Sequence, residues 1–169
     1  MNSYGLIDLH CDTLAEYWKY AHTGNPDTLD DPGRVLSLSN MPKDVHWAQF
    51  YAVFIPDEER GQAAIDCFEK NRANFYRQME KFGDRVAPCR NADDMEKAWA
   101  AGKTAAFLTI ENGSVLAGDL SRVHTLAEQG VRAITLTWNG ENELGSDFAG
   151  SVLPGGLSKA GRAARGEGM

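Results

Sequence analysis

A histidine and an aspartate lie two residues apart in the segment from Leu6 to Thr13, which reads Leu-Ile-Asp-Leu-His-Cys-Asp-Thr. The pattern predicts a short buried strand, in which residues two apart point to the same side. If this strand belongs to a parallel α/β barrel or sheet, His10 and Asp12 both project at its ligand-binding face. An imidazole and a carboxylate together suit zinc, manganese or iron. The spacing alone also fits an aspartate that caps the next helix beside a partly buried histidine.

A glutamate follows a later apolar run. Residues 105–110 predict a strand, and Glu111 comes directly after it. Because the carboxyl ends of parallel strands meet at one face, we expect Glu111 at the same mouth as His10 and Asp12. There the carboxylate could bridge two metal ions and lie close to the water that they activate, which makes Glu111 the candidate catalytic residue. The plainer alternative is a strand-end glutamate that bonds to the following loop.

A polar loop follows an aromatic residue at the end of another apolar run. Trp138 comes after the strand predicted over 133–137, and the loop continues with Asn139, Glu141 and Glu143. Since such loops shape substrate pockets in β/α barrels, Trp138, Asn139 and Glu141 are candidate substrate-binding residues. Trp138 would form a pocket wall, and Glu141 or Glu143 could bind a substrate amine. The alternatives are core or rim packing for the tryptophan and solvated loop charge for the glutamates.

Four apolar runs rich in β-forming residues must hold these side chains in place. They cover residues 6–10, 49–55, 105–110 and 133–137. The last three are nearly continuous in apolar character, which indicates strands covered on both faces. Helical patterns lie over 57–82 and after Asn91 and Asp119, each of which can cap a helix. The alternation predicts repeated β/α units around a parallel sheet.

The chain has 169 residues, which suits one ordinary domain but is short for a closed eight-stranded barrel. The pattern at 156–165 predicts the opening of another helix, and no strand follows it. We therefore expect residues 1–169 to form the amino-terminal part of a single TIM-like β/α-barrel domain, a truncated half barrel of about four strands. The alternative is a small complete α/β domain.

Composition excludes several classes of function. The 17 basic and 24 acidic residues give a net charge of -7, which repels nucleic acid and anionic membrane surfaces. Three cysteines without a Cys-x-x-Cys pair argue against a disulfide framework or a thiolate zinc cluster. The start of the chain lacks the features of a signal peptide, and no long apolar run is present. We expect a cytoplasmic protein without a nucleic-acid or membrane partner.

The remaining reactive side chains are weaker candidates. His22 and His46 lie in the loop predicted after the first strand, and His124 occupies a helical position where partial burial explains it better than ligation. Cys11 lies on the side of its strand opposite His10 and is expected to be a small core residue. Without a Gly-x-Ser-x-Gly elbow or a phosphate-binding Gly-rich loop, serine hydrolase and nucleotide hydrolase chemistry lose their main support.

Four segments, taken in this order, resemble the membrane dipeptidase (renal dipeptidase) family of metallopeptidases. They are residues 7–14, 49–54, 108–113 and 130–139. The closing Gly-Leu-Ser-x-x-Gly at 156–161 also resembles the family's start of the next helix. The match extends over essentially the whole chain, and the ordered set is more specific than any single piece.

The resemblance implies a β/α barrel that binds two zinc ions at its carboxyl mouth and hydrolyses dipeptides through a metal-activated bridging hydroxide. His10 and Asp12 match the ligands from the first strand, and Glu111 matches the carboxylate that bridges the metals. In the family, two further histidine ligands, an arginine and an aspartate come from strands beyond the fourth, for which this sequence has no counterpart. Trp138 stands where some members carry a substrate-contacting histidine.

We therefore predict the amino-terminal half of a zinc-dependent dipeptidase, weakly active or inactive alone. Open sheet edges favour a homo-oligomer or pairing with a complementary carboxyl-terminal half. One alternative is another metal-dependent amidohydrolase, against which Asp12 argues because that class usually shows His-x-His at the first strand. The other alternative is a non-catalytic half-barrel binding module.

Overall fold

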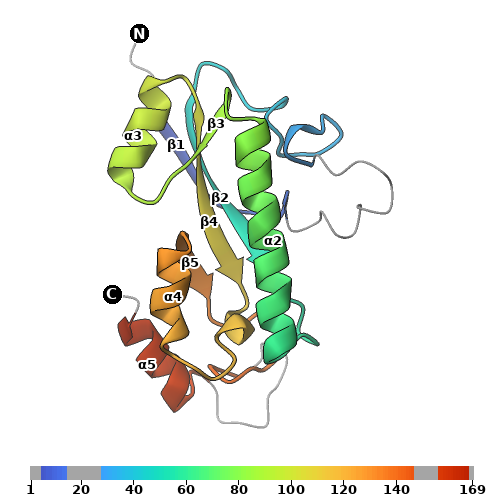
Figure 1. Ribbon diagram of the computed structural model, residues 1–169, viewed down its shortest axis with the longest axis vertical. Coiled ribbons are helices and arrows are strands. Elements are labelled where there is room, and N and C mark those ends of the chain that lie inside the picture. Colours follow the sequence, from blue (N-terminus) through green and yellow to red (C-terminus); the bar gives the residue numbers. More distant parts are fainter. Residues whose placement is uncertain (1–4, 15–27, 147–155, 168–169) are drawn as a thin grey trace. The chain divides into compact units, whose positions relative to one another are not determined.

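The fold is that of a computed structural model, which describes residues 5–14, 28–146 and 156–167 (Figure 1). The chain divides into two compact units, Met1–Val53 with Asn71–Thr109 and Phe54–Lys70 with Ile110–Met169. The division passes through two strands and one long helix. Each unit is therefore assembled from segments that are far apart in the sequence.

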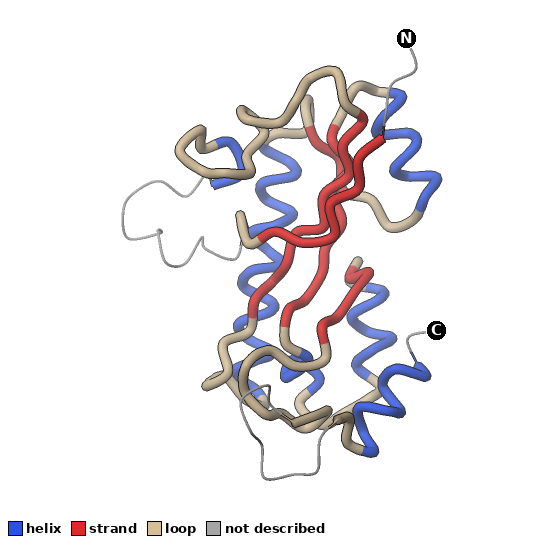
Figure 2. The backbone as a smooth tube through the Cα atoms, turned by 180° about the vertical axis from the view of Figure 1, so that it is seen from behind, coloured by secondary structure: helices blue, strands red, loops and turns tan. Residues whose placement is uncertain are grey.

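Five strands form one sheet in the described part of the chain. They are β1 Gly5–Cys11, β2 His46–Phe54, β3 Val86–Pro88, β4 Thr104–Glu111 and β5 Val131–Thr135. The order is β1-β2-β4-β3, and β5 also pairs with β4 (Figure 2). β1 is parallel to β2, and β3 is parallel to β4. Parallel strands that alternate with helices along the chain confirm the predicted β/α-barrel units.

Three strand predictions are wrong in detail. β2 covers His46–Phe54 and so begins three residues before the predicted 49–55, which places His46 in a strand and not in the predicted loop. β3 is absent from the sequence prediction because its three residues are too few to show a periodicity, so the sheet has five strands and not four. β5 covers Val131–Thr135, two residues earlier than the predicted 133–137. The apolar Leu136 and the β-branched Thr137 follow the last residue of the strand, which extends the pattern past its end.

Burial also differs between the strands. β2 and β4 are largely buried, as their continuous apolar runs indicate. In β1, by contrast, Leu6, Ile7 and Leu9 are 41%, 50% and 69% exposed, and in β5 only Val131 is buried. The predictions of a buried first strand and a fully covered fourth are therefore wrong for this chain. Among the described strands, β1 pairs only with β2 and β5 only with β4, so both lack a second neighbour to cover them.

The first unit has a small aromatic and aliphatic core. α3, Ala92–Ala100, packs on β3, and its Ala98 joins Phe107 of β4 in a buried cluster. Phe50 stacks on Phe107 with ring centroids 4.6 Å apart. Asn91 caps α3 as predicted, since its side chain accepts a hydrogen bond of 2.8 Å from the backbone N–H of Asp94.

The second unit contains η3 Gly113–Leu116, α4 Arg122–Glu128 and α5 Lys159–Glu167. α4 packs on β5. The expected cap at Asp119 is wrong, because its carboxylate accepts hydrogen bonds from the N–H and hydroxyl of Ser121 and α4 begins only at Arg122. α2, Gln62–Lys81, contributes to both units and lies within the predicted range 57–82.

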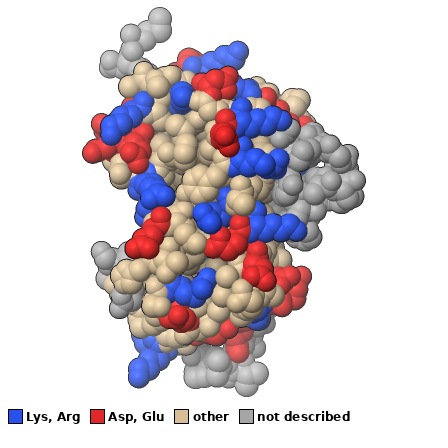
Figure 3. All heavy atoms as spheres, viewed as in Figure 1, with Lys and Arg blue, Asp and Glu red and all other residues tan. Residues whose placement is uncertain are grey.

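The surface carries charge of both signs. Acidic and basic side chains are interspersed on the face drawn in Figure 3. This arrangement differs from the continuous basic stripe that is typical of nucleic-acid-binding proteins. Among the described helices, none combines the length and the apolar character needed to cross a bilayer.

Candidate functional site

His10 and Asp12 lie side by side at the carboxyl end of β1. The distance from His10 Nε2 to Asp12 Oδ1 is 3.5 Å, and the two side chains are 46% and 51% exposed. The backbone N–H of His10 donates to Asp8 Oδ1 at 3.1 Å. The parallel register with β2 shifts between Asp8 and Cys11, where the strand ends. The period of two therefore brings an imidazole and a carboxylate together where solvent ions can reach them.

Cys11, between these two residues, has a different environment. Its side chain is buried, and burial raises the pKa of the thiol to about 12. A thiol with such a pKa stays protonated near neutral pH and is a poor nucleophile or metal ligand. This confirms Cys11 as a core residue on the opposite side of the strand.

Glu111 is the last residue of β4 and is partly buried. Its backbone carbonyl accepts a hydrogen bond of 3.0 Å from the N–H of Ile55, just beyond the end of β2. The next residue, Asn112, is fully buried and has φ 80° and ψ 106°, a conformation unusual for a residue other than glycine. Asn112 is not predictable from the sequence, because a strained backbone leaves no signal in residue type or spacing.

The predicted substrate-binding residues follow β5. Trp138 is 39% exposed, and its ring meets Phe54 edge-on with centroids 4.7 Å apart. Asn139 and Glu141 are exposed. The backbone carbonyl of Glu141 accepts a hydrogen bond of 3.0 Å from Arg60. The described residues thus hold Trp138 by ring packing and the Glu141 backbone by one hydrogen bond, with both side chains open to solvent.

The other histidines are His22, His46 and His124. His22 lies outside the described residues. The ring of His46 packs against Trp99 with centroids 5.4 Å apart.

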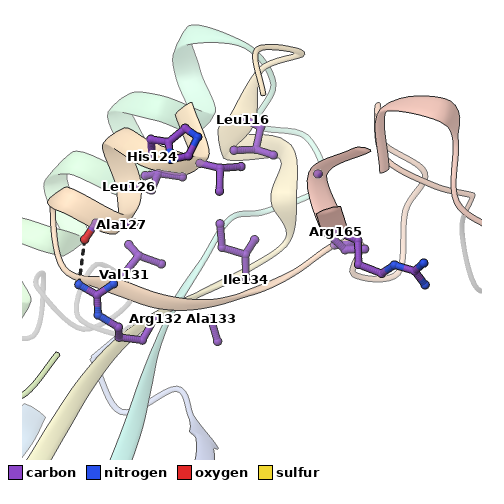
Figure 4. A pocket seen from close by; sticks show the side chains of 12 residues that line it. Leu116, His124, Leu126, Ala127, Val131, Arg132, Ala133, Ile134 and Arg165 are labelled. Atoms are coloured by element: carbon purple, nitrogen blue, oxygen red, sulfur yellow. Dashed lines mark hydrogen bonds between the residues drawn. The ribbon is translucent and has the colours of Figure 1, made fainter. Parts of the chain in front are cut away.

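His124 lines a pocket of about 480 Å³ between α4, β5 and α5 (Figure 4). The wall of this pocket is mainly aliphatic, formed by Leu116, Val123, Leu126, Val131, Ile134 and Leu136. At its rim Arg132 donates a hydrogen bond of 2.9 Å to the carbonyl of Ala127. The described lining holds a single histidine and no carboxylate or thiol.

In the described part of the chain, three residues are candidate metal ligands, and we call them the triad: His10 and Asp12 of the first unit and Glu111 of the second. One imidazole and two carboxylates form a donor set that suits zinc or another borderline divalent ion. β1 and β4 both neighbour β2 in the sheet, and the strand arrows of β2 and β4 point the same way. The residues present therefore fit a metal in type and in their position at the ends of strands.

Solved structures share this fold. The dipeptidase AC, a metallopeptidase of family M19, superposes with a TM-score of 0.80 at 21% identity, over 98% of this chain and 54% of that chain. A metallopeptidase from Rhodobacter sphaeroides, liganded with a phosphinate mimic of the dipeptide L-Ala-D-Ala, has a TM-score of 0.80 at 20% identity over 98% and 56% of the two chains. The probable dipeptidase PvdM from Pseudomonas aeruginosa has a TM-score of 0.74 at 19% identity over 95% and 43%.

The chain thus spans about half the length of the first solved structures that it matches. Their shared likeness is one of fold, that of TIM-barrel-like dipeptidases. The family is shown by the sequence itself, because the model of the membrane dipeptidase family matches residues 1–165. This chain belongs to the membrane dipeptidase family, peptidase family M19.

Proposed function

We propose that this chain carries the first metal ligands of a zinc-dependent dipeptidase. The proposal is supported by the residue types of the triad, with His10 and Asp12 at the end of β1 and Glu111 at the end of β4, in a chain of the membrane dipeptidase family. Zinc sites that do chemistry usually have three protein ligands and an open position for water or substrate. The triad supplies that number for one ion, and a second ion needs ligands from elsewhere.

Each residue has a definite task in this proposal. Zinc, when bound, supplies a hydroxide nucleophile near neutral pH and polarises the scissile carbonyl. His10 would hold the metal through a ring nitrogen, and the adjacent Asp12 would supply a negative charge that offsets the charge of the ion. Glu111, partly buried at the end of β4, would supply a carboxylate ligand to the metal and would be the candidate base for a metal-activated water.

The loop after β5 is the proposed substrate side of the site. Trp138 presents a half-exposed ring that is held by Phe54, which suits the wall of a pocket for a small side chain. Glu141 is exposed and acidic, which suits the α-ammonium group of a dipeptide. A small dipeptide is the proposed substrate, in keeping with the dipeptide mimic bound by the related Rhodobacter sphaeroides metallopeptidase.

The exposed edge strand β1 indicates a polypeptide partner. Leu6, Ile7 and Leu9 of β1 are exposed apolar side chains on a strand that pairs with β2 alone among the described strands. Such an edge favours pairing with another polypeptide. We propose that a complementary half barrel, or a second copy of this chain, covers it and contributes the ligands of the second ion.

A phosphinate dipeptide analogue tests the proposed function. Its tetrahedral phosphinate resembles the transition state of peptide hydrolysis, and such analogues bind at least about 100-fold more tightly than substrates. We expect the zinc-loaded chain to bind the phosphinate analogue of Ala-Ala more tightly than the dipeptide itself. Binding should disappear after zinc removal with EDTA and in the Glu111→Gln variant. Equal binding with and without zinc would contradict a metal-centred dipeptide site.

A further inference from the structure

The backbone is strained at the residue that follows Glu111. Asn112 has φ 80° and ψ 106°, and its side chain is completely buried. A glycine would adopt this conformation at little cost, whereas a residue with a Cβ is strained in it. Strained residues persist where the surroundings hold them firmly, and they cluster at functional sites. The side chain of Asn112 must therefore make interactions that offset the strain.

The amide of Asn112 is saturated by hydrogen bonds within the second unit. Its Nδ2 donates to the carbonyl of Ile55 at 2.9 Å and to Asp57 Oδ1 at 3.1 Å. Its Oδ1 accepts from the backbone N–H of Ser114 at 3.2 Å and from the Ser114 hydroxyl at 2.7 Å. The side chain thus links the segment after β2 to the segment after β4.

The same amide reaches the loop that follows β5. Asn142 Nδ2 donates to Asn112 Oδ1 at 2.9 Å and to the carbonyl of Leu136 at 2.8 Å. Asp57 Oδ2 accepts a hydrogen bond of 2.7 Å from the backbone N–H of Gly140. A Cβ on Gly140 would lie 2.7 Å from the carboxylate carbon of Asp57, so a side chain at this position would displace that carboxylate. The buried side chain of Asn112 therefore connects the segments that follow β2, β4 and β5.

We propose that Asn112 is a positioning residue of the metal-dependent site. Through Asp57 and Asn142 it fixes the backbone that carries Glu111 relative to the loop that carries Trp138 and Glu141. This role rests on the proposed function, because it matters only if Glu111 binds metal and the loop binds substrate. Residues that orient metal ligands typically change metal affinity by about 10–100-fold when they are replaced.

Asn112→Gly separates the role of the amide from the role of the backbone. Glycine adopts the same φ without strain, so this variant removes the hydrogen bonds and keeps the turn. Asn91→Gly is the matched control. The Asn91 side chain, like that of Asn112, accepts a hydrogen bond from a backbone N–H, here that of Asp94, but it lies at the start of α3 in the first unit. Asp57→Asn is a second variant that keeps the side-chain shape and weakens the acceptor for Gly140.

The measurement is zinc affinity by competition with a chromogenic chelator, with circular dichroism to verify that each variant is folded. We expect Asn112→Gly to weaken zinc binding about 10–100-fold and Asp57→Asn to weaken it about tenfold, while Asn91→Gly matches the wild type. Unchanged affinity in folded Asn112→Gly and Asp57→Asn would overturn the positioning role and leave the proposed function intact. A wild-type chain that binds no zinc would overturn both.

Discussion

Gly161 in α5 lies directly against the carbonyl oxygen of Leu144, with no room for a Cβ between them. The same carbonyl accepts a hydrogen bond of 2.8 Å from the backbone N–H of Ser158. The hydroxyl of Ser158 in turn donates to the carbonyl of Glu143 at 2.7 Å and accepts from the N–H of Gly161 at 3.0 Å. The start of α5 is thereby fixed to the loop that follows the predicted substrate residues.

Alanine at two glycines of α5 should have different effects on stability. Gly161→Ala must displace the backbone of Leu144, which we expect to lower the free energy of unfolding by about 1–3 kcal/mol. Gly166 has open space around the position of a Cβ, so Gly166→Ala should leave stability unchanged or raise it by up to about 1 kcal/mol. Urea unfolding followed by circular dichroism measures both, and equal stabilities would refute the close packing on Leu144.

The ion pair between Asp30 and Arg85 should make stability depend on pH. Arg85 donates to both carboxylate oxygens at 2.8 and 2.7 Å, which lowers the pKa of Asp30, with a further contribution from the Ser39 hydroxyl. Because the pKa is lower in the folded state, the stabilisation is present above the unfolded pKa of about 3.9 and is lost as the pH falls through the folded pKa. Both side chains are partly exposed, so the contribution is at most about 1 kcal/mol.

We therefore expect Asp30→Asn to destabilise the chain at pH 6, and the difference from the wild type to shrink toward pH 3. Arg85→Lys keeps the positive charge and loses the bidentate geometry. Its free energy of unfolding at pH 6 should therefore lie between those of the wild type and Asp30→Asn. Free energies of unfolding measured for the three proteins between pH 3 and pH 6 test this expectation. A difference between wild type and Asp30→Asn that stays constant with pH would show that the ion pair does not depress the pKa of Asp30.

Trp138 should contribute to ligand binding through its ring. Trp138→Phe keeps an aromatic ring against Phe54, so we expect the affinity of the zinc-loaded chain for the phosphinate analogue to change little. Trp138→Ala removes the wall and should weaken binding about tenfold, which corresponds to about 1.4 kcal/mol. Calorimetric titration measures both variants, and equal affinity for Trp138→Ala and the wild type would remove this residue from the substrate site.

Much of the fold can be read from local patterns in the sequence. The period of two over His10 and Asp12 predicts the adjacent side chains, and Asn91 predicts the start of α3, because each signal lies within a few residues. The exposure of β1 is not predictable in this way. An apolar strand indicates what the strand is able to bury, whereas its actual burial depends on neighbours that the strand sequence does not specify.

The site is predictable only in part for the same reason. His10, Asp12 and Glu111 can be identified from the sequence because residues of metal-binding type stand at the ends of apolar runs. Asn112 does not, because its partners Asp57 and Asn142 are 55 and 30 residues away in the sequence. Hydrogen bonds over such separations arise from the meeting of strand ends, which only the folded chain reveals.

Zinc binding by the triad is the central claim, and competition titration of a tag-free chain tests it most directly. We predict about one zinc ion per wild-type chain and a loss of affinity of at least about tenfold in His10→Ala, Asp12→Asn and Glu111→Gln. His124→Ala, which alters a histidine of the apolar pocket, should bind zinc as the wild type does. Wild-type affinity in folded Glu111→Gln, or no zinc bound by the wild-type chain, would contradict the account.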